Sequence, residues 1–276
     1  MTNIIDGRKL ALEHQEKVKE KLTKLHITPS VRSILIGDDP PSILYTNMKQ
    51  KKAAQVGIDF QPIRIPASEE YQKVVDLIRE LNNDPKVHGI MIQMPIPGEF
   101  LKDHNKQDIL NLIEGKKDVD GLTNKGVFLP AVVRAVMEIL EDTGIDLNNN
   151  AGLPSKKAVV LGASDLVGKP VGRELEKQGA IVNVCDKNTP NQKQLLKEAD
   201  IIVSATGVVG LLKGDMVKEG VVVVDVGSEK VGDKIMGDVE FETVAPKASK
   251  ITPVPGGVGP MTVICLMENA ADSVKP

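Results

Sequence analysis

One stretch near the start of the chain combines three side chains whose types and spacing could do chemistry. Residues 42–51 read SILYTNMKQK, and on an α-helix Ser42, Tyr45 and Lys49 stand at i, i+3 and i+7, on one face. A hydroxyl, a phenol ring and an amine on one face make a usable catalytic surface, whereas Lys51 lies well round the helix, at the rim. An ordinary surface helix with a lysine-rich face would look the same, so the remaining segments must decide between the two interpretations.

The elements that would position this helix alternate along the first half of the chain. Hydrophobic periodicity and turn residues predict helices at 6–25, 42–57, 68–81 and 130–142 and strands at 31–36, 60–65 and 87–92. Alternating strands and helices predict a parallel sheet with covering helices. Ligands bind such sheets at the carboxyl ends of the strands, so side chains that follow a strand are the ones to inspect.

Polar side chains follow the third predicted strand and the next turn. Gln93 comes directly after the strand and is followed by Pro95 and Pro97. An amide in this place is poorly explained as part of a solvent loop, and we expect it to face a ligand; a buried glutamine bonded to backbone is the alternative. Asp118 and Asp120 precede a glycine, and turn chemistry alone would explain either of them.

Composition bounds the class of protein. The 276 residues suffice for two domains, 41% are hydrophobic and 26% charged, and the net charge of −3 gives no electrostatic footprint for nucleic acid. Cys185 and Cys265 are each flanked by apolar residues and are expected to be buried free thiols. The four histidines show no metal-ligand spacing, so no metal site is expected. The first residues resemble neither a signal peptide nor a membrane span, and we expect a cytoplasmic protein without membrane attachment.

The second half of the chain has the pattern of a dinucleotide fold. After a linker at 144–155, a strand at 158–161 runs into GASDLVGKP, residues 162–170, and a helix to about Gln178. Such a turn presents free N–H groups and a helix dipole to a phosphate, although the spacing is not GxGxxG. A second strand follows at 181–185, and the strands at 199–204 and 221–226 end in the small residues Ala205-Thr206-Gly207 and Gly227-Ser228, as a cofactor lying across strand ends requires. At the end of the second strand, Asp186 suits the ribose of NAD and Lys187 suits the 2'-phosphate of NADP.

A glycine and proline loop, residues 251–262 (ITPVPGGVGPMT), precedes a final helix at 261–274. Bare backbone of this kind can approach a ligand closely, and a tight structural turn is the alternative. With this loop, the chain resembles the bifunctional methylenetetrahydrofolate dehydrogenase/cyclohydrolase family over essentially its whole length. The motifs that carry the resemblance are SxxYxxxKxK at 42–51, the glutamine and proline segment 93–97, KDVDG at 117–121, GxSxxVGxP at 162–170, ATG at 205–207, DVG at 225–227, GDV at 237–239 and the 251–262 loop.

The resemblance implies an α/β protein of two lobes with a cleft between them. An N-terminal parallel α/β catalytic domain, residues 1–145 completed by the helix at 261–274, would bind folate, and a C-terminal Rossmann-like domain, residues 146–260, would bind NADP, with NAD as the alternative. By similarity Lys49 is the catalytic amine, Gln93 assists it, Tyr45 stacks on the folate and Asp120 holds the pterin edge. The substrate-binding residues so implied are Tyr45, Lys49, Ile92, Gln93, Met94, Asp120, Pro255, Gly256, Gly257, Val258 and Gly259, and the cofactor-binding residues are Gly162, Ala163, Ser164, Lys187, Thr206, Gly207 and Ser228.

The implied reaction makes physical sense of these residues. Hydride transfer from 5,10-methylenetetrahydrofolate to a nicotinamide gives the methenyl cation, and water then opens this cation to 10-formyltetrahydrofolate. A lysine beside a cation has its ammonium form disfavoured, so a neutral Lys49 can serve as base for the water. Hydride transfer needs mainly positioning. The family's habit also implies a homodimer.

The sequence departs from the family in three places. The loop at 122–129 is short and lacks the Pro-Cys-Thr-Pro element, the usual arginine after the first glycine of the phosphate loop is Ala163, and the usual histidine after the second strand is Asp186. Two other interpretations remain. Tyr45 and Lys49 form the YxxxK of short-chain dehydrogenases, but that motif follows the glycine loop in the same domain, whereas here it precedes the loop by more than 100 residues. A folate- or nucleotide-binding protein without catalysis would not need Lys49 and Gln93.

Overall fold

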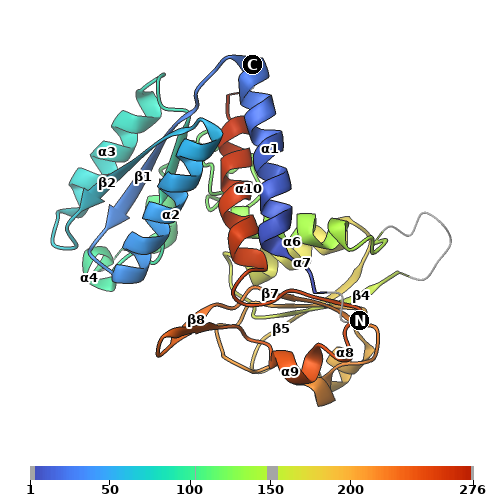
Figure 1. Cartoon of the computed structure of the whole chain (residues 1–276). Coiled ribbons are helices and arrows are strands. Elements are labelled where there is room, and N and C mark those ends of the chain that lie inside the picture. Colours follow the sequence, from blue (N-terminus) through green and yellow to red (C-terminus); the bar gives the residue numbers. More distant parts are fainter. Residues whose placement is uncertain (1–3, 103, 148–154, 275–276) are drawn as a thin grey trace. The chain divides into compact units, whose positions relative to one another are not determined.

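The computed structural model describes residues 4–102, 104–147 and 155–274. These divide into two compact units (Figure 1). The three-stranded unit comprises Glu13–Ala131 and Val263–Pro276, and the five-stranded unit comprises Met1–Leu12 and Val132–Thr262. The functional division proposed from the sequence, at residue 145, concerns ligand binding and stays a prediction. The expected linker at 144–155 lies largely outside the described residues.

The three-stranded unit has the predicted alternation of strands and helices. Its sheet has the order β2-β1-β3, and both pairs of strands are parallel. Isoleucines from all three strands and from α3 form its core, because strands covered by helices must be apolar. The elements are β1 (Ser30–Ile36), α2 (Pro40–Val56), β2 (Asp59–Ile65), α3 (Tyr71–Asn83), β3 (Gly89–Ile92), α4 (Gly98–Leu101) and α5 (Lys106–Leu110).

The five-stranded unit is a parallel sheet in the order β10-β7-β6-β4-β5. The start of the chain belongs to it, because Ile5 N donates to Ile251 O (2.8 Å) beside the edge strand β10. Its elements are α6 (Ala131–Asp142), β4 (Lys157–Leu161), α7 (Gly168–Lys177), β5 (Ile181–Cys185), α8 (Gln192–Glu198), β6 (Ile201–Ser204), a 3₁₀ turn (Gly214–Met216), β7 (Val222–Asp225), the antiparallel hairpin β8 (Glu229–Val231) and β9 (Lys234–Met236), α9 (Phe241–Val244) and β10 (Lys250–Ile251).

Two long helices near the chain ends, α1 (Gly7–Leu25) and α10 (Val258–Asp272), each begin in the five-stranded unit and end in the three-stranded one. Within the three-stranded unit they are joined by a buried bond between His14 Nδ1 and Glu268 Oε1 (2.8 Å) and by an ion pair between Lys21 and Asp272. Among the described residues, no helix is long and apolar enough to cross a membrane.

Most predicted elements are present, with shifted ends. The helix expected from residue 68 begins at Tyr71, and the final helix begins at Val258, so the last residues of the glycine loop form its first turn; Pro260 is compatible with this because proline fits a first turn. The hairpin β8–β9, the short helices α4, α5 and α8 and the two-residue strand β10 were not predicted. Cys185 and Cys265 are buried and neither forms a disulfide, as expected.

Candidate functional site

Helix α2, which carries Tyr45 and Lys49, is fixed at both ends by its own sequence. Asp39 caps its start by accepting from Ser42 N (2.9 Å) and Ser42 Oγ (2.7 Å), and Pro40 and Pro41 occupy the first turn. Gly57 ends the helix in the left-handed conformation at φ 84°. Ser42 therefore shares the face of Lys49, as predicted, but its hydroxyl is engaged in the cap.

Lys49 and Gln93 meet across the carboxyl edge of the three-stranded sheet. Lys49 Nζ donates to Gln93 Oε1 at 3.0 Å, and Gln93 Nε2 donates to the carbonyl of Met94 at 2.7 Å. The second bond fixes the orientation of the amide, so its oxygen faces the amine. Gln93 is 7% exposed and Ile92, before it, is buried in the sheet. The structure thus brings the amine from α2 to the end of β3.

The turn that carries Asp120 is held by its neighbours. Asp118 accepts hydrogen bonds from the backbone N–H groups of residues 121, 122 and 123, at 2.8–3.2 Å, so the turn explanation holds for Asp118. Lys117 Nζ donates to three carbonyls at the end of α3, at 2.7–3.0 Å. Ile90 N donates to Lys117 O (2.7 Å), which places the segment beside β3.

Asn269 of α10 braces the same turn, and it was not among the predicted site residues. Its Nδ2 donates to the carbonyls of Val119 (2.9 Å) and Leu129 (3.0 Å). Ala131 N donates to the carbonyl of Asp120 (3.2 Å). The backbone on either side of Asp120 is therefore tied to two helices, and its carboxylate has none of the turn bonds that occupy Asp118. A polar residue on the buried face of a predicted helix was the available signal.

The charges at this site act on one another. Burial lowers the pKa of Lys49, and the negative charge of Asp120 opposes that fall. Burial raises the pKa of Asp120, while Lys49 lowers it and Asp118 raises it further. A lowered pKa increases the fraction of the amine that is neutral at a given pH, and a neutral amine can act as a base.

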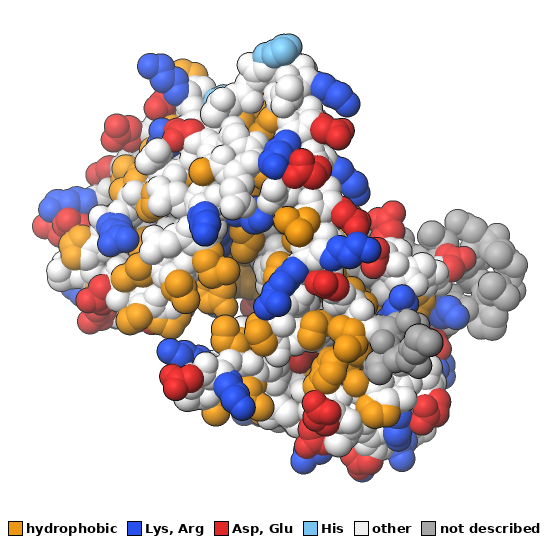
Figure 2. Space-filling view, in the orientation of Figure 1, with side chains coloured by type: hydrophobic (Ala, Val, Ile, Leu, Met, Phe, Trp, Pro, Cys, Tyr) orange, Lys and Arg blue, Asp and Glu red, His pale blue; other side chains and the backbone are white. Residues whose placement is uncertain are grey.

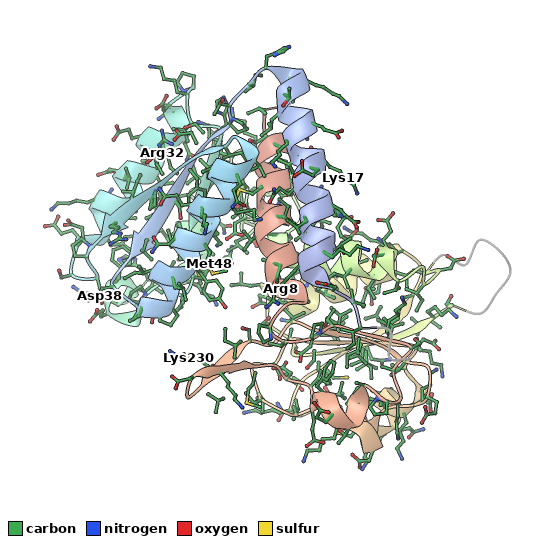
Figure 3. All side chains as sticks on the ribbon, viewed as in Figure 1. Arg8, Lys17, Arg32, Asp38, Met48 and Lys230 are labelled. Carbon is green, nitrogen blue, oxygen red and sulfur yellow. The ribbon has the colours of Figure 1, made fainter. Side chains whose placement is uncertain are left out.

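Apolar surface adjoins the amine on α2. Leu44, Tyr45 and Met48 are 60%, 39% and 49% exposed, which is unusual for side chains of this size. Figure 2 shows hydrophobic side chains gathered over the first half of α2. Figure 3 labels Met48, one residue before Lys49. The ring of Tyr45 is thus accessible to a flat ligand. The loop at 255–259 lies in the five-stranded unit, and its part in the same site stays a prediction.

The phosphate loop of the five-stranded unit is built by close backbone approaches. Gly162, at φ 99°, follows β4, and a Cβ there would collide with Ala205 O; a Cβ at Gly168 would collide with Gly162 O. The loop thus closes tightly over residues 163–167 and delivers the N-terminus of α7, whose cap residue Val167 makes no side-chain cap bond. Ser164 Oγ accepts from Val167 N and Gly168 N at a long 3.3 Å. These N–H groups fit the pyrophosphate of a dinucleotide.

The neighbouring strand ends complete this edge of the sheet. Thr206 and Gly207 follow β6, and Gly207 is exposed at φ 70°. Ser228 follows β7 and is exposed. At the end of β5, Asp186 folds back on its own turn: Oδ1 accepts from Asn188 N (2.9 Å) and Thr189 Oγ1 (3.1 Å). These bonds lower the pKa of Asp186.

The 251–262 loop is equally tight. Gly256 adopts φ 114°, and a Cβ at Gly7, the first residue of α1, would collide with Gly257 O. Pro255 and Gly259 are exposed, whereas Gly257 and Val258 are buried. The loop therefore presents part of its backbone outward and packs the rest against the start of the chain.

Two parallel α/β units, one with a glycine-rich phosphate loop and the other with a lysine of lowered pKa, define a two-domain dinucleotide-dependent enzyme. Comparison with known families agrees in both parts. Residues 5–120 match the catalytic domain of tetrahydrofolate dehydrogenase/cyclohydrolase, and residues 130–276 match its NAD(P)-binding domain. The chain belongs to the tetrahydrofolate dehydrogenase/cyclohydrolase family.

Relatives match over their full length. The bifunctional protein FolD of Moorella thermoacetica is 40% identical over 99% of this chain and 98% of its own. The crystal structure of FolD from Campylobacter jejuni superimposes with a TM-score of 0.90 at 40% identity, covering 98% of both chains. The Trypanosoma brucei enzyme, crystallised with NADP cofactor and inhibitor, has a TM-score of 0.89 at 31% identity, covering 98% of this chain and 96% of its own.

The family membership fixes the chemistry. The chain is a bifunctional enzyme of one-carbon metabolism, a methylenetetrahydrofolate dehydrogenase and methenyltetrahydrofolate cyclohydrolase with an NAD(P)-binding domain. The parallel α/β architecture and the activities predicted from the sequence are confirmed. The short-chain dehydrogenase interpretation is wrong, because Tyr45 and Lys49 lie in the unit without the phosphate loop.

The opposed charges predict a pH effect. If Lys49 is the base, as the resemblance predicts, only its neutral amine can accept the proton, so hydrolysis of the methenyl substrate should increase as pH rises through the Lys49 pKa. Asp120→Asn removes the charge that holds this pKa up. The acid limb of the kcat profile should therefore move to lower pH, while the Michaelis constant for folate rises. Rates of methenyl hydrolysis against pH, corrected for the uncatalysed reaction, measure both.

Asp76→Asn, at an exposed carboxylate on α3, is the matched control and should leave the profile unchanged. An acid limb that stays in place in Asp120→Asn would show that Lys49 does not feel Asp120.

Proposed function

We propose that Lys49, Gln93, Tyr45 and Asp120 carry the cyclohydrolase step in the three-stranded unit. The observation that carries the proposal is the bond from Lys49 Nζ to the fixed amide of Gln93, on an amine whose pKa burial lowers. An amide oxygen accepts a hydrogen bond from the amine whether or not the amine is charged, so Gln93 can hold Lys49 in place without stabilising the ammonium form as a carboxylate would.

In the proposed hydrolysis, the neutral amine of Lys49 accepts a proton from the water that attacks the methenyl carbon. The proton then passes to the ring nitrogen that leaves, which gives 10-formyltetrahydrofolate. Tyr45 supports the flat ring system by stacking, and Asp120 accepts hydrogen bonds from the amino-pyrimidine edge. In the other half of the reaction, a dinucleotide held at the phosphate loop of residues 162–164 would supply the acceptor for the hydride of methylenetetrahydrofolate. The chain's task there is to hold both molecules and exclude water.

Lys49→Met should reduce methenyl hydrolysis by at least ~10²-fold, which is the usual scale for a lost acid–base group. The decrease in absorbance of the methenyl compound measures this rate directly. Lys51→Met is the matched control, because Lys51 is an exposed lysine two residues along the same helix. Near-normal hydrolysis by Lys49→Met would contradict the assignment.

We also propose that NADP is the preferred dinucleotide. Asp186, the residue that would favour NAD, has its carboxylate engaged in the turn 186–189, where it caps Asn188 and Thr189. Lys187 is exposed and forms no ion pair within the described part of the chain, so its ammonium group is available to a 2'-phosphate. The phosphate loop residues Gly162, Ala163 and Ser164 and the strand ends Thr206, Gly207 and Ser228 would hold the rest.

Lys187→Ala should raise the Michaelis constant for NADP several-fold and leave that for NAD nearly unchanged, because only NADP carries the 2'-phosphate. Initial dehydrogenase rates with each dinucleotide measure this. Lys193→Ala, at an exposed lysine of α8 that pairs with Asp215, is the control. A wild-type enzyme that reduces NAD more efficiently than NADP would overturn the ranking.

We propose further that the enzyme is a homodimer, and that the hairpin β8–β9 takes part in the contact. An isolated two-stranded hairpin is only marginally stable in water. This one exposes Val231 at 50%, Ile235 at 42% and Met236 at 41%. The hairpin protrudes from the sheet of the five-stranded unit, and Lys230 is labelled on its strand β8 (Figure 3). A second copy that covered these side chains would remove apolar surface from water.

Val231→Glu with Ile235→Glu should convert a dimer to monomer in sedimentation equilibrium, since two charges would replace apolar contacts. Ile27→Glu, at a side chain 40% exposed in the other unit, should leave the dimer intact. A monomeric wild-type enzyme would refute the dimer, and a double variant that stays dimeric would refute the role of the hairpin.

A further inference from the structure

Two buried carboxylates in the five-stranded unit have no role in the chemistry described above. Asp225 ends β7 and is 3% exposed, and Asp238 precedes α9 and is 1% exposed. They belong to the DVG and GDV motifs. Buried carboxylates are rare unless they are paired with cations, and among the described residues neither forms an ion pair. Two such groups side by side need a physical reason.

The two carboxylates, which we call the aspartate pair, accept six hydrogen bonds at the strand ends. Asp225 accepts from three backbone N–H groups, those of Gly227 (3.0 Å), Asp238 (3.1 Å) and Val239 (3.0 Å). Asp238 Oδ2 accepts from Ser204 Oγ (2.9 Å), Thr206 N (2.6 Å) and Thr206 Oγ1 (2.8 Å). The pair thus joins the end of β6, the end of β7 and the segment before α9.

Two glycines make room for the pair. Gly227, from the motif of Asp225, lies against Asp238, and Gly237, from the motif of Asp238, lies against Asp225. A Cβ at Gly227 would collide with Asp238 Oδ1, and a Cβ at Gly237 would collide with Asp225 Oδ2. Each carboxylate therefore occupies the space that a side chain would take next to its partner. The patterns Asp-Val-Gly and Gly-Asp-Val are complementary parts of one packing arrangement.

If the aspartate pair served only as core packing, it would destabilise the folded protein. Burial raises the pKa of Asp225 to about 6, the neighbouring charge of Asp238 adds to this rise, and Asp238 Oδ1 has no hydrogen-bond partner in the described structure. Buried charges without cations usually destabilise a protein relative to apolar residues of the same size. What the carboxylates supply and apolar residues cannot is a set of acceptors that fixes backbone N–H groups in place.

The backbone that they fix is where we place the dinucleotide. Thr206 donates to Asp238 from both its N and its Oγ1, and Gly207 follows it; Gly227 donates to Asp225, and Ser228 follows it. Both loops leave neighbouring parallel strands at the edge that also holds Gly162. A displacement of either loop would alter the surface against which a cofactor lies.

We propose that Asp225 and Asp238 are positioning residues for the dehydrogenase reaction, which hold the loops after β6 and β7 in the geometry that binds the dinucleotide. The inference rests on the cofactor site proposed above and adds two residues that act through others. It separates the two activities, because the cyclohydrolase residues around Lys49 lie in the other unit.

The two oxygens of each carboxylate make the test specific. Asp225 accepts on both oxygens, so Asp225→Asn must point an NH₂ group at a backbone N–H. Asp238 accepts all three bonds on Oδ2, so in Asp238→Asn the amide oxygen can keep these bonds while the NH₂ group takes the place of Oδ1. Asp225→Asn should raise the Michaelis constant for NADP at least about tenfold, and Asp238→Asn by less than about threefold, whereas Asp238→Ala should match Asp225→Asn.

Dehydrogenase kcat at saturating NADP and the rate of methenyl hydrolysis should stay within about threefold of wild type in all three variants. Asp215→Asn, at an exposed aspartate of the same unit, is the control. Ser204→Ala removes a single donor to Asp238 and should raise the Michaelis constant for NADP about two- to fivefold. Because this change is smaller, it tests the proposal even if an aspartate variant does not fold.

An unchanged Michaelis constant in folded Asp225→Asn or in Ser204→Ala would overturn the inference, and so would a parallel fall in methenyl hydrolysis, which would mean a general structural role. If Lys187→Ala also leaves NADP binding unchanged, the proposed cofactor site is wrong. If Lys187→Ala weakens NADP binding and Asp225→Asn does not, only the positioning role is wrong.

Discussion

The three-stranded unit depends on partly shielding one amine from water without giving it a full ionic partner. Burial alone lowers the pKa of Lys49, and a carboxylate in direct contact with the amine would raise it again. In the structure the group in direct contact is the amide of Gln93, and the carboxylate of Asp120 opposes the lowering only through its charge. The caps of α2 fix the amine from one side and the bonds of Gln93 fix it from the other. The turn bonds of Asp118, the helix contacts of Lys117 and the brace from Asn269 then keep Asp120 where its charge has this effect.

The five-stranded unit has a different requirement, since the cofactor site proposed for it is made mostly of backbone. Collisions that a Cβ would cause at Gly162, Gly168 and Gly227 show how closely its segments approach. A glycine-rich loop has few side chains of its own to hold it in place, so side chains from neighbouring segments must do so. Buried acceptors beside the strand ends serve this purpose, and their low exposure protects the hydrogen bonds from exchange with water.

Local signals explain which parts of this structure could be predicted. Asp39 with two prolines, and Gly57 at the other end, encode α2 within its own sequence, and the parallel sheets follow from strand and helix alternation. The hairpin β8–β9 was missed because EKVGDKIM has mixed charge and no clear period of two, and its turn at Gly232 was the only local sign. Asn269 could not be assigned a role because its partners, Val119 and Leu129, lie 140 to 150 residues away. The roles of the individual site residues, including Lys49 and Gln93, stay predictions.

The pairing of Ile5 with Ile251 has a consequence for synthesis of the chain. The edge of the five-stranded sheet is complete only when the segment at Ile5 meets one about 246 residues further along the chain, and contacts of such sequence separation are slow to form because loop closure comes first. The three-stranded sheet has all its strands by residue 92 and can assemble earlier, although α10, which belongs partly to the same unit, follows the strands of both sheets. Neither unit is a contiguous stretch, so a fragment cut at one boundary would lack part of both, and the two must reach the native state as one chain.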